Sequence, residues 1–90
     1  MPEVTFKVTC TAAIYVVRVD DQPITFTNND GAATLASGTH GLTWHMAGNP
    51  GDKISIEAKV GDTSILKIED RKIPPKREMA WGLRNLMVPA

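Results

Sequence analysis

The sequence has one cysteine, Cys10, so no disulfide can form within the chain. This excludes a small extracellular framework held by cross-links, and the fold must depend on its hydrophobic core. The sequence also lacks a basic, apolar leader at its start and any apolar run near the roughly eighteen residues that a membrane helix needs. We therefore expect a soluble protein with no membrane partner, located in the cytoplasm, or outside it if a leader has been removed.

Catalytic motifs are absent as well. The sequence has no Gly-x-Ser-x-Gly turn, no glycine-rich phosphate loop and no paired-cysteine zinc spacing. The only histidines, His40 and His45, are five residues apart, and in a regular strand this spacing places them on opposite faces of a sheet. They could not then share a metal ion. We expect a protein that is not an enzyme, with no catalytic residues, no metal site and no cofactor.

Neither charge is in excess, since ten basic and ten acidic residues cancel. This balance argues against a domain that binds nucleic acid with its whole surface. The charges are unevenly distributed, however. Residues 1–66 hold four basic and seven acidic side chains, a net charge of −3, whereas residues 67–90 hold six basic and three acidic ones, a net charge of +3. A charge-driven contact is therefore expected from the C-terminal end.

Apolar and polar residues alternate through most of the chain, which is typical of half-buried β-strands. In the central predicted hairpin, His40–Val60, Trp44 falls on the apolar face of the first arm, so we expect it in the core. Cys10 also falls on an apolar face, which favours a core position over a reactive thiol. Tight turns are expected at Asp20–Pro23 and Asn28–Gly31. The seven predicted strands span residues 4–10, 13–20, 24–27, 32–36, 40–46, 54–60 and 63–70.

This pattern, with 42% hydrophobic residues, predicts an all-β fold. We expect a small antiparallel β-sandwich, immunoglobulin-like or of related topology, with a body spanning residues 1–70. Residues 71–90 differ because they are basic and contain Pro74-Pro75, which favours an extended course. Beyond the prolines, residues 79–87 place apolar side chains on one face of a short helix, whereas a final strand through Trp81 fits equally.

Trp81 differs from Trp44 because basic and polar residues flank it. An exposed tryptophan beside arginine can stack on a partner's ring, and both residue types are enriched at interface hot spots. The alternative is that Trp81 folds back to cap the sandwich. We hypothesise a non-catalytic protein-interaction or assembly module that binds a protein partner or a second copy of itself. The residues expected to make contact are Arg71, Lys72, Lys76, Arg77, Trp81 and Arg84.

Two other binding functions stay open. Small sandwiches with tryptophans often bind carbohydrate, and the basic C-terminal extension could bind single-stranded nucleic acid. Sugar binding would change tryptophan fluorescence with little dependence on salt. Nucleic-acid binding would weaken steeply with salt and would be lost on truncation after Asp70. The balanced net charge makes nucleic acid the less favoured partner.

Three short stretches resemble PEGA-type domains, which are small β-sandwiches. They are Ala13-Ile14-Tyr15-Val16, Asp21-Gln22-Pro23 and Gly38–Thr43. The similarity lies within residues 13–44 and departs from the family pattern at Gln22, where a glycine is expected. The resemblance implies a sandwich fold and a non-enzymatic accessory module, usually outside the cytoplasm, with no catalytic residues.

Overall fold

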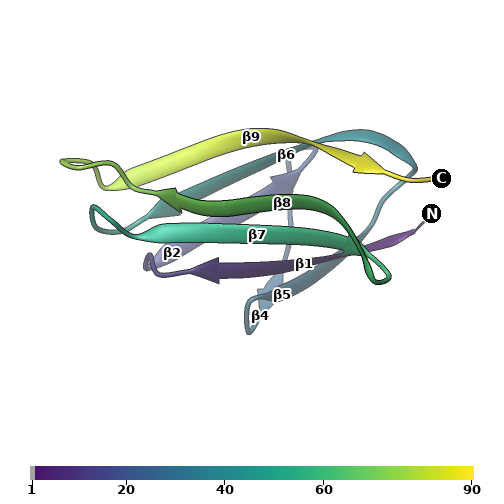
Figure 1. Cartoon of the computed structure of the whole chain (residues 1–90), viewed down its shortest axis with the longest axis horizontal. Coiled ribbons are helices and arrows are strands. Elements are labelled where there is room, and N and C mark those ends of the chain that lie inside the picture. The colour runs from purple at the N-terminus through teal and green to yellow at the C-terminus, as the bar shows by residue number, and fades with distance from the viewer. Residues whose placement is uncertain (1) are drawn as a thin grey trace.

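The computed structural model describes residues 2–90, in which nine β-strands form two antiparallel sheets (Figure 1). The first sheet has the strand order β4-β5-β1-β7-β8 and the second β3-β2-β6-β9. The strands are β1 Glu3–Cys10, β2 Ile14–Val19, β3 Gln22–Pro23, β4 Phe26–Thr27, β5 Asp30–Thr34, β6 Gly38–Ala47, β7 Lys53–Val60, β8 Thr63–Lys72 and β9 Met79–Val88. The predicted all-β fold is confirmed for these residues, whereas Met1, the first residue of the predicted body, lies outside them.

The core lies between the two sheets and follows the alternation seen in the sequence. In β1, for example, Val4, Phe6 and Val8 are buried and the residues between them are exposed. Trp44 in β6 is only 5% exposed, so its predicted core position is confirmed. Cys10 at the end of β1 is partly buried against the same core, and this burial raises the pKa of its thiol.

Two tight turns lie where the sequence predicts them. Asp20–Asp21 and Asn28–Asn29 have positive φ at both residues, which a two-residue type I′ hairpin turn requires. The predicted strand 24–27 is wrong in its extent. Its first residues, Ile24–Thr25, connect β3 in the second sheet to β4 in the first sheet, so one continuous strand cannot form there. The two strands beyond the seven predicted are β3, formed by Gln22–Pro23 of the predicted turn, and β9 near the C-terminus.

The C-terminal segment forms a strand over residues 79–88, and the helical alternative is wrong. Strand β9 pairs with β6 residue by residue, from Gly38 opposite Val88 to Ala47 opposite Met79. The long strand β6 therefore supplies a complete hydrogen-bonding partner, and Leu86 becomes fully buried. Residues 79–88 are part of the second sheet. Residues 2–90 contain no helix whose length and apolar content would allow it to cross a membrane.

The two edge strands of each sheet differ in length. Strands β3 and β4 have two residues each, whereas β8 and β9 have ten residues each. Figure 1 shows β8 and β9 running next to each other along the same side of the molecule. The long, open side of the sandwich is thus the side where the C-terminal basic residues lie.

Candidate functional site

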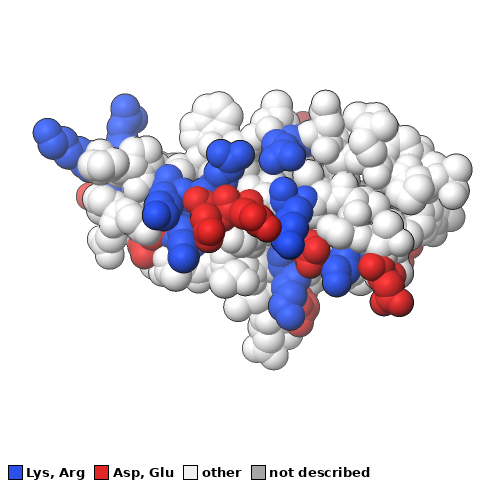
Figure 2. Space-filling view, in the orientation of Figure 1, with Lys and Arg blue, Asp and Glu red and all other residues white. Residues whose placement is uncertain are grey.

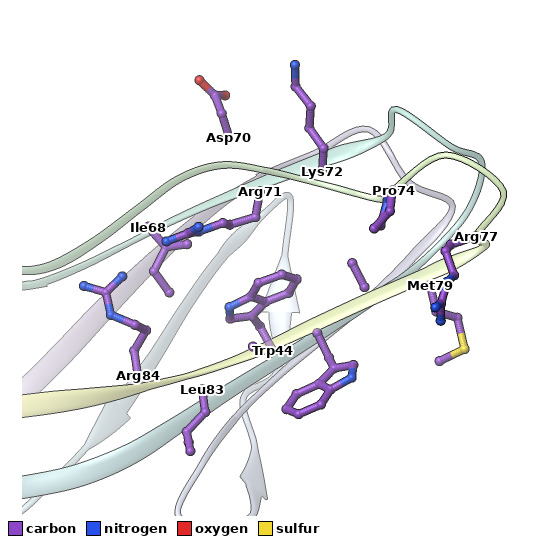
Figure 3. A pocket seen from close by; sticks show the side chains of 13 residues that line it. Trp44, Ile68, Asp70, Arg71, Lys72, Pro74, Arg77, Met79, Leu83 and Arg84 are labelled. Carbon is purple, nitrogen blue, oxygen red and sulfur yellow. The ribbon is translucent and has the colours of Figure 1, made fainter.

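A groove of about 710 Å³ runs between β8 and β9 on this open side. Trp44 from β6 and Ile68 from β8 form its apolar floor. Figure 3 shows the indole of Trp44 between the β8 and β9 ribbons. Arg71 and Arg84 extend toward the same end of the groove, whereas Asp70 and Lys72 point away from it (Figure 3). The groove therefore combines an aromatic floor with cationic margins.

A β-bulge in β8 turns Arg71 into the groove. Ile68 lies opposite Ile56 and Arg71 opposite Ile54, so two residues of β8 face the single residue between them on β7. At the bulge, Asp70 has φ 49° and its N–H donates a hydrogen bond to Ser55 Oγ at 3.0 Å. The extra residue shifts the alternation of the strand. Arg71 consequently shares a face with the buried Ile54, although a regular strand would point it outward.

Strand β9 presents a second inward-facing arginine. Arg84 lies directly opposite Leu42, which is fully buried, so both side chains are on the core face of the second sheet. Two residues earlier, Gly82 lies opposite Trp44, and a Cβ at Gly82 would come within 2.6 Å of the indole Nε1. The missing side chain at Gly82 therefore lets the indole lie flat against β9 and reach the open edge.

The cations of the groove have no ionic partner within residues 2–90. Four ion pairs form among residues 2–90, and none of them includes Arg71, Lys72, Arg77 or Arg84. Their positive charge is therefore available to an external anionic group. In Figure 2, positive and negative side chains are gathered over β1, β7 and β8, whereas the margin along β9 is mostly uncharged.

An apolar strip follows the outer face of β9 beside the groove. Met79, Trp81 and Leu83 are 58%, 69% and 62% exposed, although they also line the groove. The Trp81 indole stacks on His45 of β6, with ring centroids 6.5 Å apart and an interplanar angle of 25°. This stacking holds the tryptophan at the sheet surface. The alternative in which Trp81 folds back as a buried cap is wrong.

Five of the six residues predicted to make contact line this groove, although the side chain of Lys72 points away from it: Arg71, Lys72, Arg77, Trp81 and Arg84. The sixth, Lys76, is exposed in the loop between β8 and β9 and does not line the groove. Sequence reasoning missed Met79 and Leu83, although their alternation with Trp81 was the signal for an exposed strand face. It also placed Trp44 in the core without indicating that one edge of its ring reaches the open side.

The two histidines lie on opposite faces of the second sheet, as predicted, because the ladder between β6 and β9 is regular. His40 is on the inner face, whereas His45 is on the outer face, stacked on the groove residue Trp81. His40 Nδ1 donates to Asp20 Oδ2 at 2.5 Å and Nε2 donates to the Ala36 carbonyl at 2.7 Å. The bond to Asp20 is the main cause that raises the pKa of His40, and it lowers the pKa of Asp20. Among residues 2–90, no group of three or more His, Cys, Asp or Glu side chains is placed to hold a metal ion.

No protein-family model, curated protein or solved structure matches the chain. The immunoglobulin-like topology and the relationship to PEGA-type domains therefore stay predictions.

Proposed function

We propose that this protein is a non-catalytic protein-interaction module that binds its partner in the groove between β8 and β9. The observation that carries the proposal is the pair of inward-facing arginines, Arg71 and Arg84, one on each edge strand above the Trp44 floor. Arginine and tryptophan are the residue types that contribute most to binding at interfaces, and they act best in partly desolvated pockets.

The apolar strip beside the groove supports a protein partner. Met79, Trp81 and Leu83 are exposed in a continuous row along one strand, next to unpaired arginines. An interface that covers this row would remove a large apolar area from water, while the arginines would select the partner by charge. Neither contribution requires a cofactor or a chemical step.

The test is a selection of peptides from a random displayed library on the full chain. Peptides that are enriched are synthesised and titrated against the wild type, the double variant Arg71→Glu/Arg84→Glu and the matched control Lys76→Glu. We expect affinity for the double variant to fall by at least about tenfold, because two attractive charges become repulsive. Lys76→Glu carries the same kind of charge change outside the groove and should bind within about twofold of the wild type.

Two results would contradict the proposal. If the enriched peptides bind the double variant as tightly as the wild type, the groove is not the binding site. If no peptide is enriched and a single-stranded oligonucleotide or an oligosaccharide binds instead, the partner is not a protein. Nucleic-acid binding would be recognised by a steep loss of affinity with salt, and sugar binding by a weak salt dependence.

A further inference from the structure

We propose that the partner is an extended segment with acidic side chains, which adds to the second sheet as a new antiparallel strand along β9. This inference rests on the proposed function, because it specifies how the partner occupies the same groove. It is carried by three features of β9: a free hydrogen-bonding edge, the lack of the protection that the other edges have, and the charges beside it.

The hydrogen-bonding edge of β9 that faces away from β6 is unpaired. The Gly48 N–H donates to the Glu78 carbonyl at 2.9 Å, one step beyond the β6–β9 ladder. Hydrogen-bonded pairs alternate in an antiparallel ladder, so the even-numbered residues of β9 point their N–H and C=O groups toward β6. The odd-numbered residues point theirs toward the open side, and these are Met79, Trp81, Leu83, Asn85 and Met87.

The other three edge strands are protected against pairing. Strands β3 and β4 have only two residues each. Strand β8 is long, but its register shifts at the bulge and it exposes the charged side chains of Lys67, Glu69 and Asp70. Short length, bulges and charges are the devices that prevent edge-to-edge association. Strand β9 is neither short nor bulged, and Arg84 is its single charged residue.

The side chains around this edge define the chemistry of an added strand. Side chains of a strand alternate between two faces, so one row of the new strand would continue the core face and the other the outer face. The core-face row would meet Arg84 on β9 and Arg71 across the groove, which favours carboxylates. The outer-face row would lie beside Trp81 and Leu83, which favours apolar, β-branched side chains.

A second copy of the chain fits this edge poorly. Strand β9 contains no acidic residue, so two β9 strands paired about a two-fold axis would offer no countercharge. Such pairing would also bring both Arg84 side chains onto the same face near the axis, and like charges close together on paired strands are unfavourable. The partner segment is therefore one with acidic side chains from a different protein.

The experiment uses an acetylated, amidated peptide of about seven residues in which valine and glutamate alternate, long enough to span the free edge. It is titrated into the full wild-type chain while tryptophan fluorescence is measured. In an antiparallel pair, hydrogen-bonded residues lie directly opposite each other and their side chains share a face. The valines on the outer face would therefore make main-chain hydrogen bonds to Trp81 and Leu83. One control peptide is therefore N-methylated at two valines, and a second, matched control is N-methylated at two glutamates.

We expect the valine-methylated peptide to bind at least about tenfold more weakly than the unmodified one, since it loses main-chain hydrogen bonds. The glutamate-methylated peptide should bind within about threefold, because those N–H groups would face solvent. Amide exchange at Trp81, Leu83 and Asn85 should slow by about tenfold or more in the complex. Arg84→Glu should weaken binding by at least about tenfold, and Lys76→Glu should not.

Each contrary result has a separate meaning. If both methylated peptides bind equally and the β9 amides stay unprotected, strand addition is wrong, although a peptide that still depends on Arg84 would leave the proposed function intact. If the unmodified peptide fails to bind at about 1 mM, an acidic strand is not the occupant, and the library selection decides the proposed function independently. If the chain alone forms a dimer with protected β9 amides, the occupant is a second copy and this inference is overturned.

Discussion

The imidazole of His40 has a hydrogen-bond acceptor beside each ring nitrogen. A carboxylate and a carbonyl oxygen both accept, so this arrangement favours the imidazolium, which donates from both nitrogens. The second oxygen of Asp20 accepts the Gly41 N–H at 3.0 Å, which anchors the carboxylate to β6. The charged pair thereby ties the turn at Asp20 to the start of β6.

Stability should depend on pH through this pair. Because folding raises the pKa of His40, its stabilisation is fully present below the ordinary value of 6.5 and is lost as the pH rises through the raised pKa of the folded state. The stabilisation from Asp20 is present above its ordinary pKa of 3.8 and is lost as the pH falls through the lowered folded value. We expect Tm, measured by circular dichroism, to fall as the pH rises above 6.5 and through the raised pKa of His40.

Two variants identify the group responsible. His40→Gln should lower Tm at about pH 6 and flatten its decline toward higher pH, because glutamine carries no titrating charge. His45→Gln replaces the histidine on the opposite face of β6 and should keep the wild-type decline. An unchanged decline in His40→Gln would show that other groups cause it.

The Trp44 indole of β6 lies so close to Gly82 of β9 that a side chain at position 82 would clash with it. We expect Gly82→Ala to destabilise the protein by about 1–3 kcal/mol in urea unfolding, because the added methyl group would displace the Trp44 indole. The matched control is Gly41→Ala on β6, where an added Cβ meets nothing within 4 Å and the free energy of unfolding should change by less than about 0.5 kcal/mol. Equal effects of the two substitutions would contradict this account of the contact.

Among the elements, those with a strict alternation of apolar and polar residues were predicted well. Strands β1, β6 and β7 follow the predicted faces because each has one buried and one exposed side. The predicted hairpin over His40–Val60 is wrong, however, because β6 lies in the second sheet and β7 in the first, so its two arms do not pair. Strand β9 was ambiguous, because its apolar residues fit a helix face as well as a strand. The edge that β6 offers for pairing decided between the two, and its residues lie 32 to 50 positions earlier in the chain, from Ala47 opposite Met79 to Gly38 opposite Val88.

The residues of the groove could be predicted from the sequence, but their arrangement could not, because it depends on pairing between distant strands. The basic residues and Trp81 were identified from their local composition, which is visible in sequence. The inward direction of Arg71 depends on the bulge at Asp70, and an aspartate with positive φ has no specific sequence signal. The free edge of β9 follows from the order of strands in two sheets, which no local pattern encodes.

At the scale of the whole molecule, the basic C-terminal segment lines the open side of the sandwich. The chain has a radius of gyration of 12.9 Å, close to the roughly 12 Å expected for a single compact unit of this length. The net charge of +3 in residues 67–90 is therefore held against the acidic remainder of the chain as part of the same body. The position of this positive charge on the molecule, and not only its sign, therefore determines which partner surface it can contact.

Strand β9 is needed for the fold, so we expect truncation after Asp70 to unfold the protein. Leu86 and Val88 are buried, and burial of each such side chain contributes about 1.5–3 kcal/mol, while β9 also covers the Trp44 ring. A domain of this size has a total stability of only about 5–15 kcal/mol, so a chain that ends at Asp70 should not fold, as judged by the dispersion of its amide NMR spectrum. In the full chain, relaxation of residues 79–88 should match that of β6. A folded truncated chain, or fast independent motion of residues 79–88, would mean that β9 is a detachable arm, and the groove would then exist only when that arm is docked.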